Sequence, residues 1–293
     1  MSKDLTQVLT YVETGNAEAG FVWDTIALTS DKVRIVAVAP SNSHMDKKRS
    51  IEMELLKMIQ QQMAEIVDKM SWQEEKVQVI NTRALTVEEA IGNPERQDYP
   101  IQKGKEVMLE TVFKGHKGQA FTDQPGNFTG TLQDVLNLPL QSNFERAVLI
   151  ATLNALLRSL GKVDKTVHCR DQEPGLCAQH LVEVVRERFG NPRIAFIGLQ
   201  PGMIGALSKE FDLRVADLDP ENVGKIKAGV LIEDVSHTQE IIDWGDIVLA
   251  TGSTSVNNSI RDLVGKKPVI FYGVTIAGVA HLNGFEQYCY CGH

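Results

Sequence analysis

The sequence predicts an α/β protein with two domains: an α+β domain over residues 1–161 and a domain with a parallel sheet over residues 162–293. Two observations predict this class. Before Gly161, short β-rich runs and amphipathic helices follow one another without regular alternation, which is typical of α+β domains. After Gly161, apolar runs of strand length alternate with helices, as in a parallel sheet covered on both faces. The length of 293 residues is sufficient for two such domains.

Composition and charge narrow the class of protein. The net charge of −8 disfavours nucleic-acid binding, which depends on Lys and Arg neutralising phosphates. The polar stretch 1–16 lacks the apolar core of a signal peptide, and no run of apolar residues is long enough to span a membrane. Four cysteines without a secretory signal indicate cytosolic thiols. We therefore expect a cytoplasmic protein that binds a small molecule or a metal chelate, and a homo-oligomer stays open.

In the first domain, apolar residues at helical spacing predict two long helices, over residues 50–70 and 143–160. Gly161 is placed to end the second of them. The methionine-bearing stripe of the first helix is more often core than a partner surface. Shorter helices are predicted over 4–14, 86–91 and 132–136, strands over 21–28, 33–39, 77–80, 105–114 and 118–122, and loops over 92–100 and 124–130.

In the second domain, a polar connector over residues 162–176 precedes the alternating pattern. Strands are predicted over 193–197, 213–218, 230–232, 246–250 and 268–272, and helices over 177–189, 202–210, 237–244 and from Thr254 through Leu263.

Residues 193–220 form the strand–turn–helix–strand unit of a Rossmann-like domain. Asp217 and Asp219 lie 19 and 21 positions after Gly198, the distance at which an acid meets a ribose hydroxyl in dinucleotide sites. However, the glycine pattern is G-x-x-x-G-x-x-G, and Pro201 removes an amide that could face a pyrophosphate. A nucleotide site and a cofactor-free platform therefore both stay open.

Ligands of such sheets bind beyond the carboxyl ends of the strands, where this sequence carries small and hydrogen-bonding residues. The candidate cofactor-binding residues are Gly198, Gln200, Gly202, Asp217, Asp219, Gly252, Ser253, Thr254 and Thr275. The cofactor itself is unknown, and a transition metal ranks ahead of a nucleotide or S-adenosylmethionine.

The connector and the last residues of the chain are rich in metal-ligand side chains. Imidazole and thiolate suit soft and borderline metals, and the candidate ligands are His168, Cys169, Cys177 and Cys289. The candidate acid–base residues are His168, Asp171 and Glu173. The alternative is a capped loop with no ligand. The segment Cys289–His293 resembles an ordinary frayed terminus unless it folds back onto the connector.

Several motifs in combination resemble the family of putative heavy-metal chelation proteins. They are Lys103–Glu106, Gly118–Asp123, Ala151–Ala155, Val167–Cys169, Glu173–Pro174, Ile197–Gly202, Ala250–Thr254 and Pro268–Gly278. The resemblance covers both halves of the chain. One departure is Gln287-Tyr-Cys289, where family members tend to have Arg-Phe-Cys, so a positive charge near the site is missing.

The resemblance implies a first domain similar to the enolase N-terminal fold, a Rossmann-like second domain and a ligand site in the cleft between them. It also implies a role in heavy-metal chelation or in handling a metal chelator. The alternative is a Rossmann-type enzyme that acts on a pterin-, flavin- or siderophore-like substrate by condensation, hydrolysis or group transfer, with a nucleotide or S-adenosylmethionine as its cofactor.

Overall fold

A computed structural model describes residues 44–70, 79–265 and 267–293. The helix predicted over residues 4–14 and the strands predicted over 21–28 and 33–39 lie outside the described residues. Residues 52–293 form one compact unit that contains both sheets of the described chain. No helix of the described residues combines the length and the apolar character that crossing a membrane requires.

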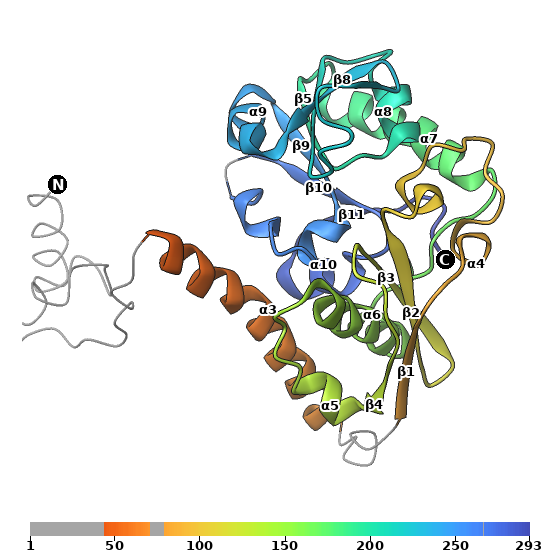
Figure 1. The fold of residues 1–293 in the computed structure, drawn as a ribbon, viewed down its shortest axis with the longest axis vertical. Helices are drawn as coiled ribbons and strands as arrows, with labels where there is room; N and C mark the ends of the chain where they lie inside the picture. The colour runs from red at the N-terminus through yellow and green to blue at the C-terminus, as the bar shows by residue number, and fades with distance from the viewer. Residues whose placement is uncertain (1–43, 71–78, 266) are drawn as a thin grey trace, which may run out of the picture. The chain divides into compact units, whose positions relative to one another are not determined.

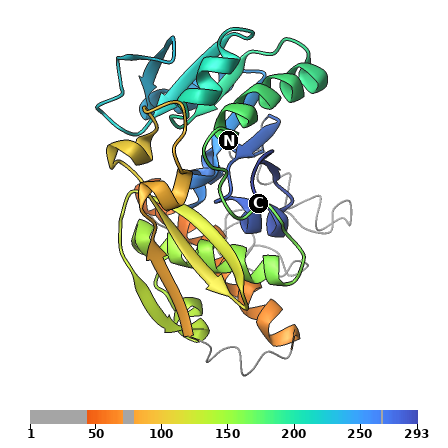
Figure 2. The same cartoon turned by 90° about the vertical axis from the view of Figure 1, so that its right-hand side faces the viewer.

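The first sheet, sheet A, has four antiparallel strands among the described residues, in the order β3-β2-β1-β4 (Figure 2). They are β1 (Val79–Ala84), β2 (Val107–Phe113), β3 (His116–Thr122) and β4 (Phe128–Thr131). Lys114 and Gly115, both at positive φ, join β2 to β3 in a tight hairpin. The loop predicted over residues 124–130 was wrong at its end, because β4 begins at Phe128 and pairs with β1. The predicted strand 77–80 overlaps only the start of β1.

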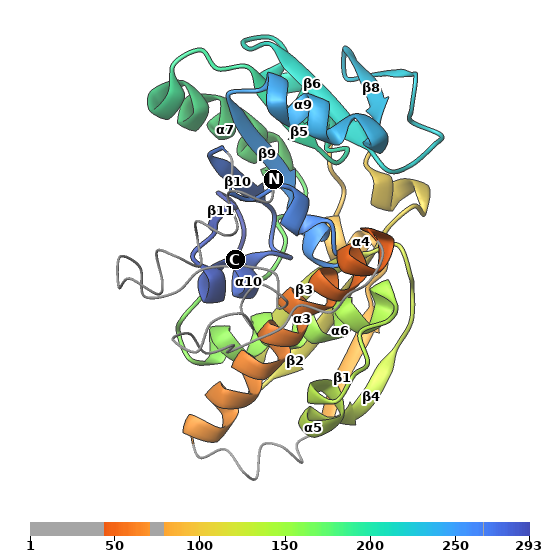
Figure 3. The same cartoon turned by 90° about the vertical axis from the view of Figure 1, so that its left-hand side faces the viewer.

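Helix α6 covers one face of sheet A (Figures 1 and 3). The helices of this part of the chain are α3 (His44–Lys69), α4 (Val87–Ile91), the 3₁₀ helix η2 (Pro100–Lys103), α5 (Leu132–Leu136) and α6 (Asn143–Ser159). Helices α4 and η2 pack with Met108 of β2 in a separate apolar cluster. Ser142 and Glu145 form a capping box at the start of α6, and Gly161 follows its end at a φ of 64°. Met63 of α3 is fully buried, as expected for a core stripe, whereas Met58 and Met70 of the same predicted stripe are exposed.

The second sheet, sheet B, has seven strands among the described residues, in the order β11-β10-β9-β5-β6-β8-β7. They are β5 (Ile194–Ile197), β6 (Leu213–Asp217), β7 (Ile226–Lys227), β8 (Val230–Asp234), β9 (Ile247–Thr251), β10 (Val269–Tyr272) and β11 (Glu286–Tyr288). Every pair is parallel except β7 with β8. The predicted class, a mixed α/β protein with an antiparallel and a mostly parallel sheet, is confirmed.

The helices around sheet B are α7 (Glu173–Phe189), α8 (Pro201–Leu207), α9 (Thr238–Trp244), α10 (Ala277–Asn283) and the 3₁₀ helices η3 (Val235–His237), η4 (Gly252–Ser255) and η5 (Ile260–Asp262). The helix predicted from Thr254 through Leu263 was wrong, because only the separate turns η4 and η5 form there. Helix α7 begins four residues before the predicted start, with Pro174 in its first turn.

Apolar residues on both faces of sheet B are buried. Ile194 and Phe196 of β5 point to a cluster with residues of α7 and α8, whereas Ala195 and Ile197 belong to a second cluster. This second cluster continues into α6 and sheet A, so one apolar core extends across residue 161. The domain boundary at residue 161 stays a prediction.

Candidate functional site

The carboxyl ends of β5, β6, β9 and β10 lie along one edge of sheet B, which we call the carboxyl edge. The strand order reverses between β5 and β9, the position at which open α/β sheets bind ligands. Gly198 follows β5 with a φ of 96°, and a Cβ there would lie 2.7 Å from Cγ2 of Thr251 in β9. Only glycine fits where these two strand ends approach each other.

Asp217, the last residue of β6, holds the turn that follows β5. Its Oδ2 accepts a hydrogen bond from the Leu199 N–H at 2.9 Å. Its Oδ1 accepts from the Asp219 N–H at 3.0 Å and from Nδ2 of Asn222 at 2.9 Å. Asp219 in turn accepts from the Glu221 N–H at 2.9 Å. The two acids selected for ribose binding therefore shape the loops at the carboxyl edge.

The hydroxyl groups selected after β9 and β10 also bind within the protein. Thr254 Oγ1 donates to the Thr251 carbonyl at 2.7 Å, and the Ser253 N–H donates to Thr251 Oγ1 at 3.3 Å. Thr275 Oγ1 accepts from the Phe121 N–H of β3 at 3.0 Å, which ties sheet A to the carboxyl edge. Thr254 and Thr275 are each only 2% exposed, so a ligand would meet the backbone around them first.

Gln200, Gly202 and Gly252 lie where the backbone packs closely. Gln200 Oε1 accepts from the Met203 N–H and so caps α8. A Cβ on Gly202 would lie 3.1 Å from the Tyr99 hydroxyl, and one on Gly252 would lie 2.8 Å from the Ile276 nitrogen. Tight packing therefore accounts for these two glycines whether or not a ligand binds.

Glu106, the residue before β2, is a candidate that sequence reasoning does not select. Burial, and then repulsion from the carboxylates of Asp217 and Asp123, raises the pKa of Glu106 to about 7. Burial, followed by the carboxylates of Asp217 and Glu106, raises the pKa of the Tyr272 hydroxyl at the end of β10, so Glu106 lies near the carboxyl edge. A carboxyl group that titrates near neutral pH can exchange a proton with a ligand. The motif Lys103–Glu106 is the sequence signal that could have identified it.

We expect the Glu106→Gln substitution to stabilise the protein above neutral pH. An acid whose pKa rises from 4.5 to about 7 on folding contributes most below pH 4.5, and that contribution is lost as the pH rises through 7. Glutamine removes this loss, so the variant should gain up to about 3 kcal/mol at pH 8 and little at pH 4.5. Urea unfolding at both pH values measures it. The exposed Glu95→Gln is the matched control, and parallel shifts in both variants would contradict the prediction.

His168 lies where burial disfavours the charged form of its imidazole. Its Nδ1 lies 2.6 Å from the Cys169 carbonyl, which can only accept, so Nδ1 carries the hydrogen and Nε2 is the basic nitrogen. Burial lowers the pKa of His168 to about 4. Its ring meets that of Phe121 edge-on at 5.4 Å. A neutral imidazole with a fixed tautomer suits a base or a hydrogen-bond acceptor.

The two other candidate acid–base residues hold the connector in place. Asp171, at a φ of 55°, accepts from the Asn93 N–H at 2.9 Å and donates its own N–H to the Ile91 carbonyl at 2.9 Å. Glu173 accepts from the Arg170 N–H at 2.8 Å. The capped loop that the sequence left open as an alternative is thus present around these acids.

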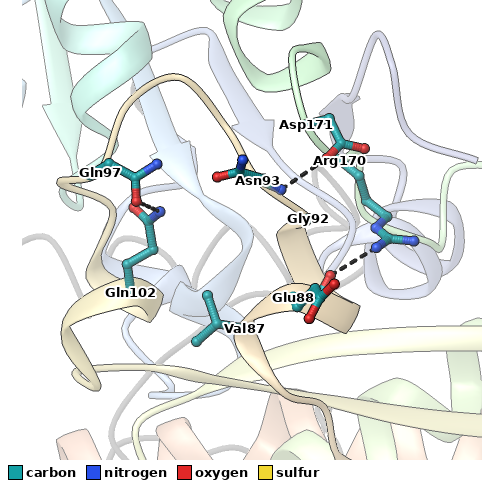
Figure 4. Close-up of a pocket in the computed structure, with 8 residues that line it drawn as sticks. All are labelled: Val87, Glu88, Gly92, Asn93, Gln97, Gln102, Arg170 and Asp171. Carbon is teal, nitrogen blue, oxygen red and sulfur yellow. Dashed lines mark hydrogen bonds between the residues drawn. The ribbon is translucent and has the colours of Figure 1, made fainter.

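A pocket of about 650 Å³ opens beside this loop, and Figure 4 shows the side chains around it. It is lined by Val87, Glu88, Gly92, Asn93, Gln97, Gln102, Arg170 and Asp171. Arg170 donates to the Glu88 carbonyl at 2.9 Å, and Gln102 donates to Gln97 at 2.9 Å. Among the candidate residues, it includes only Asp171.

The four cysteines of the sequence form one group, which we call the thiol cluster. Cys177 of α7 is its centre: its sulfur is hydrogen-bonded to the thiols of Cys169 and Cys291, and Cys289 lies near it. The Cys291 N–H donates to Cys177 Sγ at 3.2 Å. The hydrogen bond from Cys169, followed by those from Cys291, lowers the pKa of Cys177, whereas burial raises the pKa of Cys289 to about 12. No disulfide joins the four residues.

The segment 286–293 is ordered against the connector, so the expectation of a frayed end was wrong. Val167 donates its N–H to the His293 carbonyl at 2.8 Å and accepts from the His293 N–H at 2.9 Å. The Tyr288 hydroxyl donates to the Cys177 carbonyl at 2.6 Å. Gln287, where the family tends to have arginine, donates to the carbonyls of Lys165 and Gly273 at 3.0 Å each. These contacts bring Cys289 and Cys291 to the connector. No pattern in the sequence predicts them.

The candidate metal ligands are only partly brought together. Cys169, Cys177 and Cys289 share the thiol cluster, whereas the imidazole of His168 is turned to Phe121 and the Cys169 carbonyl. In residues 44–70, 79–265 and 267–293, no three His, Cys, Asp or Glu side chains are arranged as ligands of one metal ion.

Comparison with known proteins finds a family similar to part of the second half of the chain. Residues 180–280 match the model of a family described as "Putative heavy-metal chelation". This match confirms the family resemblance for residues 180–280. It covers sheet B from β5 through β10 and the greater part of α7.

Two solved structures of proteins of unknown function from this family are similar to the chain. One, from Pyrococcus horikoshii, has a TM-score of 0.44 and 14% identity, over 75% of this chain and 79% of that one. The other, from Desulfitobacterium hafniense, has a TM-score of 0.43 and 12% identity, over 61% of this chain and 73% of that one.

A short segment of the chain is similar to a protein that is described differently from this family. Over 42 residues, the chain is 57% identical to the putative ABC transporter substrate-binding lipoprotein YvgL of Bacillus subtilis. The match covers 14% of this chain and 16% of the lipoprotein, so the chain spans less than a fifth of the length of this curated relative.

Proposed function

We propose that the protein chelates a soft heavy-metal ion through the thiol cluster, with Cys177 as the central ligand. One observation carries the proposal: four cysteines from three separate segments gather at one place, although Cys169 and Cys291 are 122 positions apart in the sequence. Thiolate sulfur is the protein donor that soft metals prefer. The family match supports the same chemistry.

Metal uptake by the reduced, untagged protein tests this proposal. After dialysis against cadmium(II), copper(I) or zinc(II) and removal of free metal, we expect elemental mass spectrometry to find one equivalent of at least one soft ion. The Cys177→Ser variant should lose it. His168→Gln is the matched control, because its imidazole lies outside the thiol cluster, and it should retain the metal. Wild-type protein that retains none of the three ions would refute the proposal.

A second candidate function rests on Glu106. Its pKa of about 7, beside the carboxyl edge of a Rossmann-like sheet, favours acid–base chemistry on a pterin-, flavin- or siderophore-like ligand bound at this edge. Such a ligand could itself be a metal chelator, which would join the two functions. Thermal-shift measurements with NAD, S-adenosylmethionine, pterins and flavins test it, and no shift at saturating concentration would refute it.

A further inference from the structure

We infer that the thiol cluster selects a two-coordinate soft monovalent ion of the copper(I) class over zinc, with Cys169 and Cys177 as its two sulfur ligands. This inference rests on the proposed chelating function and specifies the class of ion.

The arrangement of the sulfur atoms provides the first argument. Cys177 is hydrogen-bonded to Cys169 and to Cys291, and each of these contacts joins two sulfur atoms. Within the described chain, no three ligand side chains surround a common point. Zinc in a structural protein site requires four ligands at the corners of a tetrahedron, whereas copper(I) is satisfied by two sulfurs in line.

The surroundings of the pair provide the second argument. Cys169 and Cys177 are 5% and 4% exposed, and both belong to the apolar cluster that contains Phe196 and Tyr288. Little water can reach this place to complete the coordination of zinc. A pair of thiolates with a monovalent cation needs no further ligand, which suits an apolar environment.

Cys289 and Cys291 lie near this pair and are not metal ligands in the inferred site. Cys291 donates its backbone N–H to Cys177 Sγ at 3.2 Å, the kind of contact that orients a metal ligand from outside the coordination shell. Cys289 packs against Gly292, where a Cβ would overlap its sulfur. Lys165 donates to the Gly292 carbonyl at 2.9 Å, which places a positive charge near Cys289 and Cys291 at the side of the pair.

A competition experiment on the reduced 293-residue chain, under nitrogen, tests the inference. Bicinchoninate competes for copper(I), and the dye 4-(2-pyridylazo)resorcinol competes for zinc(II). We expect one copper(I) to be retained with two sulfur neighbours by X-ray absorption, while the dye removes zinc. Cys169→Ser and Cys177→Ser should each weaken copper(I) binding by at least about 100-fold, whereas Cys291→Ser, which keeps the backbone N–H to Cys177, should weaken it by less than about 10-fold.

Cys289→Ser distinguishes the two classes of site, because a pair does not need Cys289 but a tetrahedral four-thiolate site does. We expect it to retain copper(I), with circular dichroism confirming that each variant is folded. Zinc held as tightly as copper(I), or three or more sulfur neighbours, would overturn the inference and leave the chelating function intact. Failure of the wild-type protein to retain any of the ions would instead refute the proposed function.

Discussion

Replacing Gly118 with alanine should destabilise the protein by about 3 kcal/mol or more. Gly118 lies in β3 where helix α6 crosses sheet A, and a Cβ there would overlap the Ala151 carbonyl oxygen and the Ala155 nitrogen. It would also lie 2.9 Å from the carbonyl carbon of Asn154. All three atoms are backbone, so no side chain can turn away, and the helix itself must move off the sheet.

Urea denaturation measures this effect, and Gly175→Ala is the matched control. A Cβ on Gly175 meets nothing within 4 Å, and the residue lies in the first turns of α7. Alanine there should leave the free energy of unfolding unchanged or raise it by up to about 1 kcal/mol, because alanine favours the helix. If Gly118→Ala unfolded within 1 kcal/mol of the wild-type protein, the packing of α6 on β3 would differ from the one described.

Replacing Asn154 with leucine should destabilise the protein by about 4 kcal/mol. Asn154 of α6 is fully buried, and its Nδ2 donates to the carbonyls of Gln119 at 3.0 Å and of Val274 and Thr275 at 3.2 Å. Its Oδ1 accepts from the Gly278 N–H at 2.7 Å. Leucine has a similar size but leaves these backbone groups buried without partners, and each costs about 1 to 3 kcal/mol.

Thr152→Val is the matched control for this substitution. Thr152 is as deeply buried in the same helix, but its hydroxyl donates only to the Val148 carbonyl one turn earlier. Its loss should cost about 1 kcal/mol. Equal destabilisation by the two variants would show that Asn154 does not join α6 to both β3 and the segment after β10.

The elements that local patterns describe well were predicted from the sequence. The capping residues Thr86 and Ser142 each precede a glutamate by three positions, and the structure has helices starting after both. The buried strands β5 and β9 were predicted because they are short apolar runs with both faces covered. A strand that is buried on both faces appears in the sequence as a continuous apolar run, whichever strands pair with it.

The elements that were missed depend on a partner elsewhere in the chain. Strand β4 contains Thr and Gly and is a strand because β1 offers it an edge. Strand β11 forms in the same way beside β10. A residue such as Glu286 has no preference that marks it as strand, because pairing at an edge is set by the neighbouring backbone.

For the candidate site, the sequence by itself determined the donors and the chain order: glycines and acids after the strands, and sulfur and imidazole in the connector. Tertiary structure alone decided which of them meet. The hydrogen bonds of Val167 to His293 bring Cys291 to Cys177, 114 positions apart, and burial beside Asp217 gives Glu106 its raised pKa. The physical reason is that both effects act through space between distant segments, whereas patterns in a sequence report only what is near along the chain.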